Sequence, residues 1–405
     1  MKLFAKLLLL LISLLVPQAS SICFERCLPS LGVIWGDGLA QSEVCHHEAS
    51  ALWDKSTRFG NVSEPLFVSG PYAKNRFLPR SLKPVVDRSS AKIRSVPRSL
   101  HISSNWRTEK QISRVKAGEG AGKAFKFIVL GDSTGQGNFV SKIWYKPEHS
   151  KKVFKKHLGK MSSLNPGFSM HVGDMTEDGM LEQFDALAWV LDKKVAFPFL
   201  TNVGNHDLTK TQYGSLPVYY NQFFGDANYY FDYKGFRFIC VDSSDDKVDQ
   251  SEMRWLEKTL KTKNRIFVFT HKPPVDLSMW TKWLWIDKGG FREGSKEFTG
   301  LMQEYEVERV YMGHIHGFGV TKYKDVRYRL TAGGGSPLYP WKPVKYKFYH
   351  FIEVSVSSDG KIMETVYKLN GNRKGDGEYV AKPISDFDSG LTSVDSVIAP
   401  FFKTD

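Results

Sequence analysis

The chain has 405 residues, of which 41% are hydrophobic, and 56 basic against 43 acidic residues give it a formal net charge of +13. This length accommodates one large domain with extensions or two domains, and the hydrophobic content excludes a mostly disordered chain. The positive charge indicates attraction to anions but carries no information about the fold.

Residues 1–21 have the pattern of a secretory signal peptide. Lys2 and Lys6 form a basic start, an apolar run covers residues 7–16, and small residues suited to cleavage follow. The run is shorter than the roughly 20 apolar residues that span a bilayer, so we interpret it as a cleaved signal, with an uncleaved anchor as the alternative. We therefore expect export, either to a periplasm or as a secreted protein.

The four cysteines fit export. Cys23, Cys27 and Cys45 follow the predicted cleavage site, where an oxidising compartment permits a disulfide, although the sequence does not show which pair forms it. Cys240 lies in the apolar run 236–241 and is expected to be a buried free thiol. Asn61 begins an Asn-Val-Ser sequon, which matters only if the host glycosylates.

Residues 22–123 form a basic extension in which Gly and Pro interrupt the apolar runs. Between residues 71 and 118, twelve Lys or Arg accompany two acidic residues. This segment either holds an anionic polymer or membrane surface, or is an extended, solvated segment lying on the domain. Its few aromatic residues argue against base stacking, and we expect no sequence-specific binding of nucleic acid.

A domain over residues 124–369 is predicted from strands that each end in a polar turn, and a tail over 370–405 follows it. Apolar runs predict strands at 124–130, 168–172, 196–203, 237–241, 265–270 and 308–312, with further β structure at 328–332 and 348–356. Helical spacing predicts helices at 180–191, with Thr176 as the N-cap, and at 249–261 and 296–305.

The turns after the six strands carry carboxylate, amide and imidazole groups, which are ligands for divalent metals of hard to borderline character. In chain order the turns hold Asp132, Asp174, Asn205 with His206, Asp242, His271, and His314 with His316. We leave out Asp242, because the two serines after it are typical of an ordinary turn. A single histidine at a strand end is usually structural, but five polar turns at one sheet edge indicate a metal site.

The series Gly-Asp132, Gly-Asp174, Gly-Asn205-His206, His271 and Gly-His314-Ile-His316 resembles the calcineurin-like metallophosphoesterase superfamily over roughly residues 125–368. Among its members the chain is most similar to the purple acid phosphatase and cyclic-nucleotide phosphodiesterase-like branch. The resemblance implies an α/β fold, α+β by some schemes, built as a four-layer α/β/β/α sandwich. It also implies two divalent or trivalent metal ions, which would be Fe, Mn or Zn.

The resemblance further implies a role for each residue. Asp174 would bridge two metals, of which the first would also bind Asp132 and His316, and the second Asn205, His271 and His314. His206 would face the phosphate and stabilise charge or protonate the leaving oxygen, and Asp207 would either orient His206 or stabilise the turn. The implied activity is hydrolysis of phosphate mono- or diesters, in a small molecule or nucleotide, by hydroxide formed at the dinuclear site.

The sequence departs from the family pattern at Thr134, where His or Gly is usual, and a hydroxyl is a poor replacement for an imidazole. Glu177 occupies the position of the purple acid phosphatase tyrosine, so we expect no purple iron–tyrosinate centre. Glu177 either supplies a carboxylate or complements a helix N-terminus, and Gln136 and Asn138 are other candidate ligands.

Two other functions are compatible with part of this pattern. The altered first motif also fits a catalytically impaired protein that binds phosphorylated ligands. A serine esterase using Ser133 would leave the His and Asn turns unexplained. The insertion 275–300 holds Trp280, Trp283 and Trp285, which either cover the substrate as a lid or anchor the insertion to the domain.

Overall fold

The computed structural model describes residues 104–118, 120, 122–134, 147–283, 286–287, 289–338, 347–370 and 377–388. All of them belong to the second of the two units into which the chain divides, Leu66–Asp405. Several features predicted from the sequence lie outside the described residues: the signal peptide, Cys23, Cys27, Cys45, Asn61, Gln136, Asn138, Trp285 and most of the basic extension.

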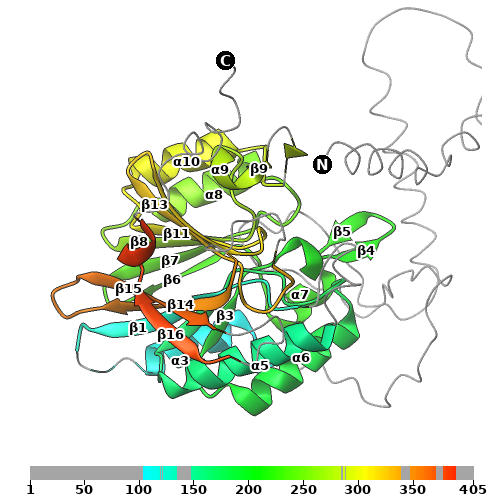
Figure 1. Ribbon diagram of the computed structural model, residues 1–405. Coiled ribbons are helices and arrows are strands. Elements are labelled where there is room, and N and C mark those ends of the chain that lie inside the picture. The colour runs from blue at the N-terminus through cyan, green and yellow to red at the C-terminus, as the bar shows by residue number, and fades with distance from the viewer. Residues whose placement is uncertain are drawn as a thin grey trace, which may run out of the picture. The chain divides into compact units, whose positions relative to one another are not determined.

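Two six-stranded sheets form the centre of the domain (Figure 1). The first has the order β16-β15-β14-β1-β2-β3, and its members are β1 (Phe125–Leu130), β2 (Phe168–His171), β3 (Phe199–Thr201), β14 (Tyr349–Val356), β15 (Ile362–Leu369) and β16 (Tyr379–Pro383). The second has the order β12-β13-β11-β8-β7-β6, and its members are β6 (Tyr229–Tyr233), β7 (Phe236–Val241), β8 (Arg265–Thr270), β11 (Arg309–Met312), β12 (Phe318–Tyr323) and β13 (Val326–Thr331). Strands β1 to β3 run parallel, as do β7, β8, β11 and β13.

The sheets pack face to face through aromatic side chains. The ring of Phe127 in β1 lies 5.3 Å from those of Phe238 in β7 and Phe267 in β8, and Phe168 in β2 lies 5.2 Å from Phe238. Inward-facing residues of both sheets thus share one buried core, as in a β-sandwich.

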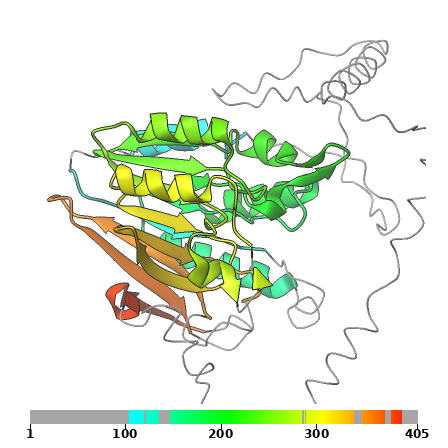
Figure 2. The same ribbon diagram turned by 90° about the horizontal axis from the view of Figure 1, so that it is seen from above.

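Helices cover the outer faces of both sheets. The first sheet packs against α5 (Pro147–Ser163), α6 (Leu181–Lys194) and α7 (Val218–Phe223), and the second against α8 (Gln250–Leu260), α9 (Ser278–Thr281) and α10 (Ser295–Glu304). Figure 2 shows α8 and α10 side by side over the second sheet. The predicted four-layer α/β/β/α arrangement is therefore confirmed.

The packed domain begins before the boundary predicted at residue 124. Helix α3 (Thr108–Ala117) buries Val115 and Gln111, and the Gln111 side chain accepts the backbone N–H of Phe199 at the edge of β3. Arg107 and Arg114 donate to backbone carbonyls of the domain, so this end of the basic extension is bound to protein. The helix escaped prediction because its few apolar positions stand among charged ones.

The domain also extends past the end predicted at residue 369. Strand β16 pairs with β15, and in the short helix α11 (Ser385–Asp388) the ring of Phe387 lies 4.8 Å from Phe318. Cys240 is a buried free thiol, as predicted. Among the described residues, no helix is long and apolar enough to cross a membrane.

Candidate metal centre

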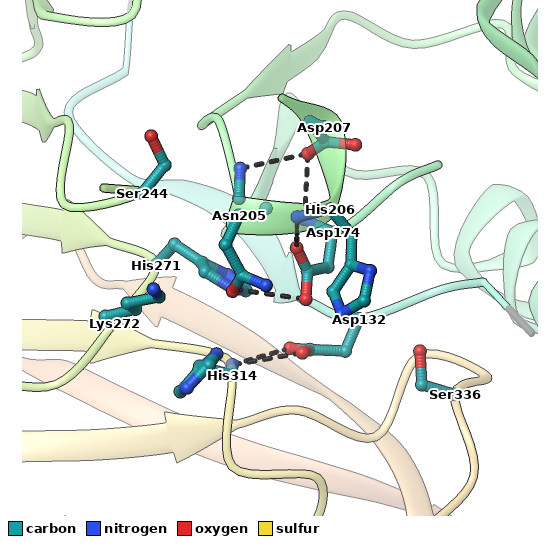
Figure 3. A network of polar contacts seen from close by, with 12 residues as sticks. Asp132, Asp174, Asn205, His206, Asp207, Ser244, His271, Lys272, His314 and Ser336 are labelled. Atoms are coloured by element: carbon teal, nitrogen blue, oxygen red, sulfur yellow. Dashed lines mark hydrogen bonds and ion pairs between the residues drawn. The ribbon is translucent and has the colours of Figure 1, made fainter. Parts of the chain in front are cut away.

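The predicted ligands come from the strand ends of both sheets, which meet at one edge of the sandwich (Figure 3). Asp132 follows β1, Asp174 follows β2, and the short 3-10 helix η1 (Asn205–Asp207) follows β3. His271 follows β8 directly, and His314 and His316 follow β11. Ligand sites at the carboxyl ends of parallel strands are the general expectation for such sheets.

Three of these residues adopt a backbone conformation that non-glycine residues rarely take. The φ angles of Asp132, Asp174 and His314 are 59°, 60° and 69°. Such left-handed residues cost conformational energy and concentrate at functional sites. Two glycines make room beside them, because a Cβ on Gly204 would lie 2.2 Å from Asp174 Oδ1, and one on Gly313 2.5 Å from Asp132 Oδ2.

The side chains form two groups that share Asp174. One group is Asp132, Asp174 and His316, the other is Asp174, His271 and His314, and in each the ligand atoms lie within 4.8 Å of one another. Asn205 joins the second group, since its Oδ1 lies 3.1 Å from His271 Nε2. Carboxylate, amide oxygen and imidazole together suit a divalent first-row metal, so the donor set fits the predicted pair of ions.

Backbone carbonyls orient two of the imidazoles. His271 Nδ1 donates to the carbonyl of Val172 and His316 Nδ1 to that of Pro337, each at 2.8 Å. With the Nδ1 proton held by a carbonyl, Nε2 points into the centre, which is the arrangement expected for metal-binding histidines. The Nε2 atoms lie 3.2 Å from Asp174 Oδ2 and 3.3 Å from Asp132 Oδ1, respectively.

The electrostatics of the centre favour added positive charge. Burial opposes ionisation of Asp174, but the neighbouring His271, aided by His206 and His314, brings the pKa of Asp174 below its usual value. Burial likewise opposes protonation of His271, but Asp174 and then Asp132 raise the pKa of His271 to about 9. Burial and the adjacent His271 lower the pKa of His314, which leaves its imidazole neutral.

His206 stands at the open side of the centre. Its Nδ1 lies 2.9 Å from the Glu177 carbonyl, and its backbone N–H donates to Asp174 Oδ1 at 2.9 Å. His206, Asn205 and His314 are each half-buried, whereas Asp132, Asp174 and His271 are fully buried. A substrate would therefore approach from the side of these three half-buried residues.

Asp207 takes the second of its two predicted roles. Its buried carboxylate accepts the backbone N–H groups of Gly204, Asp174, Met175 and Thr176 at 2.8–2.9 Å. The His206 ring is oriented by the Glu177 carbonyl instead. Asp207 thus stabilises the turn that carries Asp174.

Thr176 is not the N-cap of α6, contrary to the prediction. The helix starts at Leu181 with Met180 at the N-cap, and the Thr176 hydroxyl bonds to Asp207 and to the His206 carbonyl. The interaction with a residue 31 positions away is invisible to a local capping pattern.

The residues around the altered first motif have other contacts. The Thr134 hydroxyl donates to the Thr176 carbonyl at 3.2 Å, and Glu177 belongs to neither ligand group. Asp242 accepts the backbone N–H and hydroxyl of Ser244, as expected of an ordinary turn. The buried hydroxyl of Ser133 has no hydrogen-bond partner among the described residues, so no histidine activates it as a nucleophile there.

A loop that the sequence showed only as a glycine-rich turn supports the first group. Gly334 N donates to the Gly131 carbonyl, and Ser336 N donates to the Asp132 carbonyl. The next residue, Pro337, supplies the carbonyl that orients His316. The pattern Gly333-Gly334-Gly335-Ser336 at a strand end was the available signal, since such a loop allows close backbone contact.

One tryptophan of the insertion anchors it to the domain. Trp280 is 6% exposed and belongs to the core under α8 and α10. A Cβ on Gly319 in β12 would lie 2.8 Å from its indole nitrogen. The structure therefore favours an anchoring role for Trp280; the side chain of Trp283 lies outside the described residues.

Comparison with known proteins agrees with this architecture. Residues 125–318 match the family model of calcineurin-like phosphoesterases. A nucleotide pyrophosphatase/phosphodiesterase from Hordeum vulgare is 28% identical over 174 residues, which are 36% of this chain and 47% of that protein. The chain thus spans about half the length of this curated relative.

Similar solved structures share little sequence with the chain. A purple acid phosphatase from yellow lupin (Lupinus luteus) aligns with a TM-score of 0.49 at 16% identity, over 65% of this chain and 53% of that one. A dimetal phosphatase from Danio rerio aligns with a TM-score of 0.42 at 12% identity, over 64% of this chain and 98% of that one.

The fold and the site define an α/β/β/α sandwich with two candidate metal-ligand groups that share a carboxylate. The family match over residues 125–318, which include every candidate ligand, identifies this part of the chain as a calcineurin-like phosphoesterase domain.

Proposed function

We propose that the chain is a phosphoric ester hydrolase with a dinuclear metal centre built from the two ligand groups. The observation that carries this proposal is the sharing of Asp174 between them. Two bound metal ions, which we take to be Fe, Mn or Zn, would supply a nucleophile from water near neutral pH and offset charge on the phosphoryl oxygens. The signal-like residues 1–21 support export of the enzyme to a periplasm or as a secreted protein.

The chain's own residues would bind and orient the ester. The half-buried His206 faces the open side, and its Nδ1 contact with the Glu177 carbonyl leaves Nε2 directed toward a substrate. In the protonated form, Nε2–H would stabilise the phosphoryl charge or transfer its proton to the leaving oxygen. Asp207 would act as a positioning residue, because it bonds the Asp174 turn and does not face the open side.

The two positions would differ in their affinity for metal. The second group offers four ligands, whereas the first offers three and lacks an imidazole at Thr134. We therefore expect weaker binding of the first metal. This feature also favours the second candidate function, a catalytically impaired protein that binds phosphorylated ligands.

For the substrate we propose a phosphorylated small molecule or nucleotide. The similarity to the nucleotide pyrophosphatase/phosphodiesterase from barley supports a nucleotide diester, and the chain's partial coverage of that protein leaves a monoester as the other choice. The basic segment 71–118 remains a proposed contact for an anionic polymer or surface, and its described part binds the domain.

Metal content and hydrolysis of an aryl phosphate monoester and diester, measured together, test the proposal. About two metals per chain, with turnover lost on chelation, would support the enzyme, and the preferred ester would identify the subclass. Asn205→Ala and His271→Ala should each lose more activity than Thr134→Ala. One metal or none, without turnover after adding Mn, Fe or Zn, would support the binding protein instead.

A further inference from the structure

The glycine-rich loop 333–337, which supports the first ligand group, is itself bound by two buried histidines. The Gly333 carbonyl accepts the backbone N–H of His350 at 3.0 Å and lies 3.2 Å from Nε2 of His157. A Cβ on Gly333 would lie 2.2 Å from His350 Nδ1, so the loop backbone packs directly against this ring. Both histidines are fully buried, His157 in α5 and His350 in β14.

The contacts of His157 define which of its ring nitrogens carries the proton. A carbonyl oxygen can only accept, so Nε2 donates to Gly333. Burial lowers the pKa of His157 to about 3, so the ring is neutral and Nδ1 remains an acceptor. The hydroxyl of Tyr379 lies 2.8 Å from Nδ1 and therefore donates to it. Two hydrogen bonds in series thus connect Tyr379 through His157 to Gly333.

The other end of the loop contacts the ligands of the first group. The Ser336 N–H donates to the Asp132 carbonyl at 2.9 Å, and the Pro337 carbonyl accepts from Nδ1 of His316 at 2.8 Å. In the second group, His271 takes its carbonyl partner from the turn after β2 instead. The position of the loop therefore bears chiefly on the first group.

We propose that Tyr379 and His157 are positioning residues for the first metal and act through the backbone of the loop, an inference that rests on the proposed dinuclear centre. The first group has only three ligands, so its affinity for metal depends closely on how Asp132 and His316 are held. Tyr379 begins β16 and lies beyond the family match at 125–318. The metal centre thus depends on a strand outside the matched part of the chain.

The hydroxyl of Tyr379 can be tested apart from its ring. The rings of His157 and Tyr379 pack on Phe351, at 5.5 and 5.7 Å. This packing stabilises the fold whatever happens at the metal centre. Tyr379→Phe keeps the packing and removes the hydrogen bond that fixes the tautomer of His157, so it isolates the positioning role.

Chelator titration of the Co²⁺-loaded full chain, followed by the visible absorption of the bound ions, measures the affinity of each metal position. His316→Ala removes a ligand of the first position only and His271→Ala one of the second, so these variants assign the two transitions of the wild type. Tyr379→Phe should bind Co²⁺ about tenfold more weakly at the first position and as wild type does at the second.

Three further variants show whether the two residues act in series. His157→Phe should weaken the first position at least as much as Tyr379→Phe, and the double variant no more than His157→Phe alone. His157→Gln should restore the affinity, because its amide keeps a donor and an acceptor. The control is Tyr367→Phe on β15, whose ring lies 5.0 Å from the same Phe351, and it should bind both metals as wild type does.

Different results would overturn the inference and the proposed function. Wild-type affinity of Tyr379→Phe at the first position, or equal weakening of both positions, would overturn the positioning role alone. A loss in Tyr367→Phe equal to that in Tyr379→Phe would do the same. A wild-type chain that binds no Co²⁺ would overturn the proposed dinuclear centre, and this inference with it.

Discussion

The backbone N–H of Asp174 donates a 2.9 Å hydrogen bond to the buried carboxylate of Asp207. The acceptor atom in this bond is Asp207 Oδ2, which also accepts the backbone N–H of Gly204. Asp207 Oδ1 accepts the backbone N–H groups of Met175 and Thr176. One carboxylate therefore joins the turn after β2, which carries the shared ligand, to the turn after β3.

Asp207→Asn should lower metal content and stability together. Both carboxylate oxygens of Asp207 accept backbone N–H groups. An asparagine side chain has only one oxygen, so its NH2 group would face two of these N–H donors. Each buried group left unsatisfied costs about 1–3 kcal/mol in the free energy of unfolding. Metal analysis and urea unfolding measure both effects, with Asp178→Asn, exposed in the same loop, as the matched control. Wild-type metal content in Asp207→Asn would contradict the positioning role.

The sequence revealed the candidate ligands because their signals are local. Asp132, Asp174 and His271 each follow an apolar run that forms a strand, and the structure brings these strand ends together. The partners of Asp207 and Thr176 were not predictable, because those contacts join turns about 30 residues apart.

Gly204→Ala should abolish metal binding without unfolding the protein. The added Cβ would lie 2.2 Å from Asp174 Oδ1 and 2.3 Å from its backbone nitrogen, so the shared ligand must move. Loss of metal binding, with hydrolysis lost as a consequence, is the expected result. Gly300→Ala provides the control, since a Cβ there meets nothing within 4 Å. The steric account fails if Gly204→Ala binds metal as wild type does.

Helices α3 and α5 are elements that the sequence pattern does not predict. In α5 the buried Val153, Phe154 and Leu158 alternate with pairs of lysines, and the first turn lies beyond a glycine-rich stretch. The edge strand β16 has mostly exposed side chains, so only its pairing with β15 identifies it. In each case tertiary contacts, which a single sequence does not display, decide the structure.

Glu364→Gln should destabilise the sandwich without direct effect on the ligands. On β15 of the first sheet, Glu364 accepts from Arg329 at 2.8 Å and Arg309 at 3.1 Å, both on strands of the second sheet, and from Tyr311 at 2.8 Å. Removing this charge leaves two buried guanidinium groups without their shared carboxylate, at a cost of about 3–5 kcal/mol.

Urea unfolding at neutral pH measures this cost. Glu257→Gln is the comparison, because Glu257 pairs with the exposed Lys261 and such a pair contributes little to stability. Equal losses in the two variants would show that the buried cluster is no more important to stability than a surface pair.

Two buried histidines should make the fold sensitive to acid. Burial lowers the pKa of His157 to about 3 and that of His350 to about 4, from a usual value of 6.5. Below pH 6.5 the unfolded chain therefore binds protons that the folded chain does not. Stability is fully present above that pH and falls as the pH drops toward 4, by about 1.4 kcal/mol per pH unit for each histidine.

His157→Gln tests this origin of the acid sensitivity. His157 lies 2.8 Å from the hydroxyl of Tyr379 and 3.2 Å from the carbonyl of Gly333, contacts that an amide can also make with its donor and acceptor. The variant should therefore lose one titrating group and unfold with a shallower pH dependence between 6.5 and 4, measured as the urea midpoint at each pH. An unchanged slope would assign the acid sensitivity to other groups, because linkage requires the slope to equal the difference in bound protons between the two states.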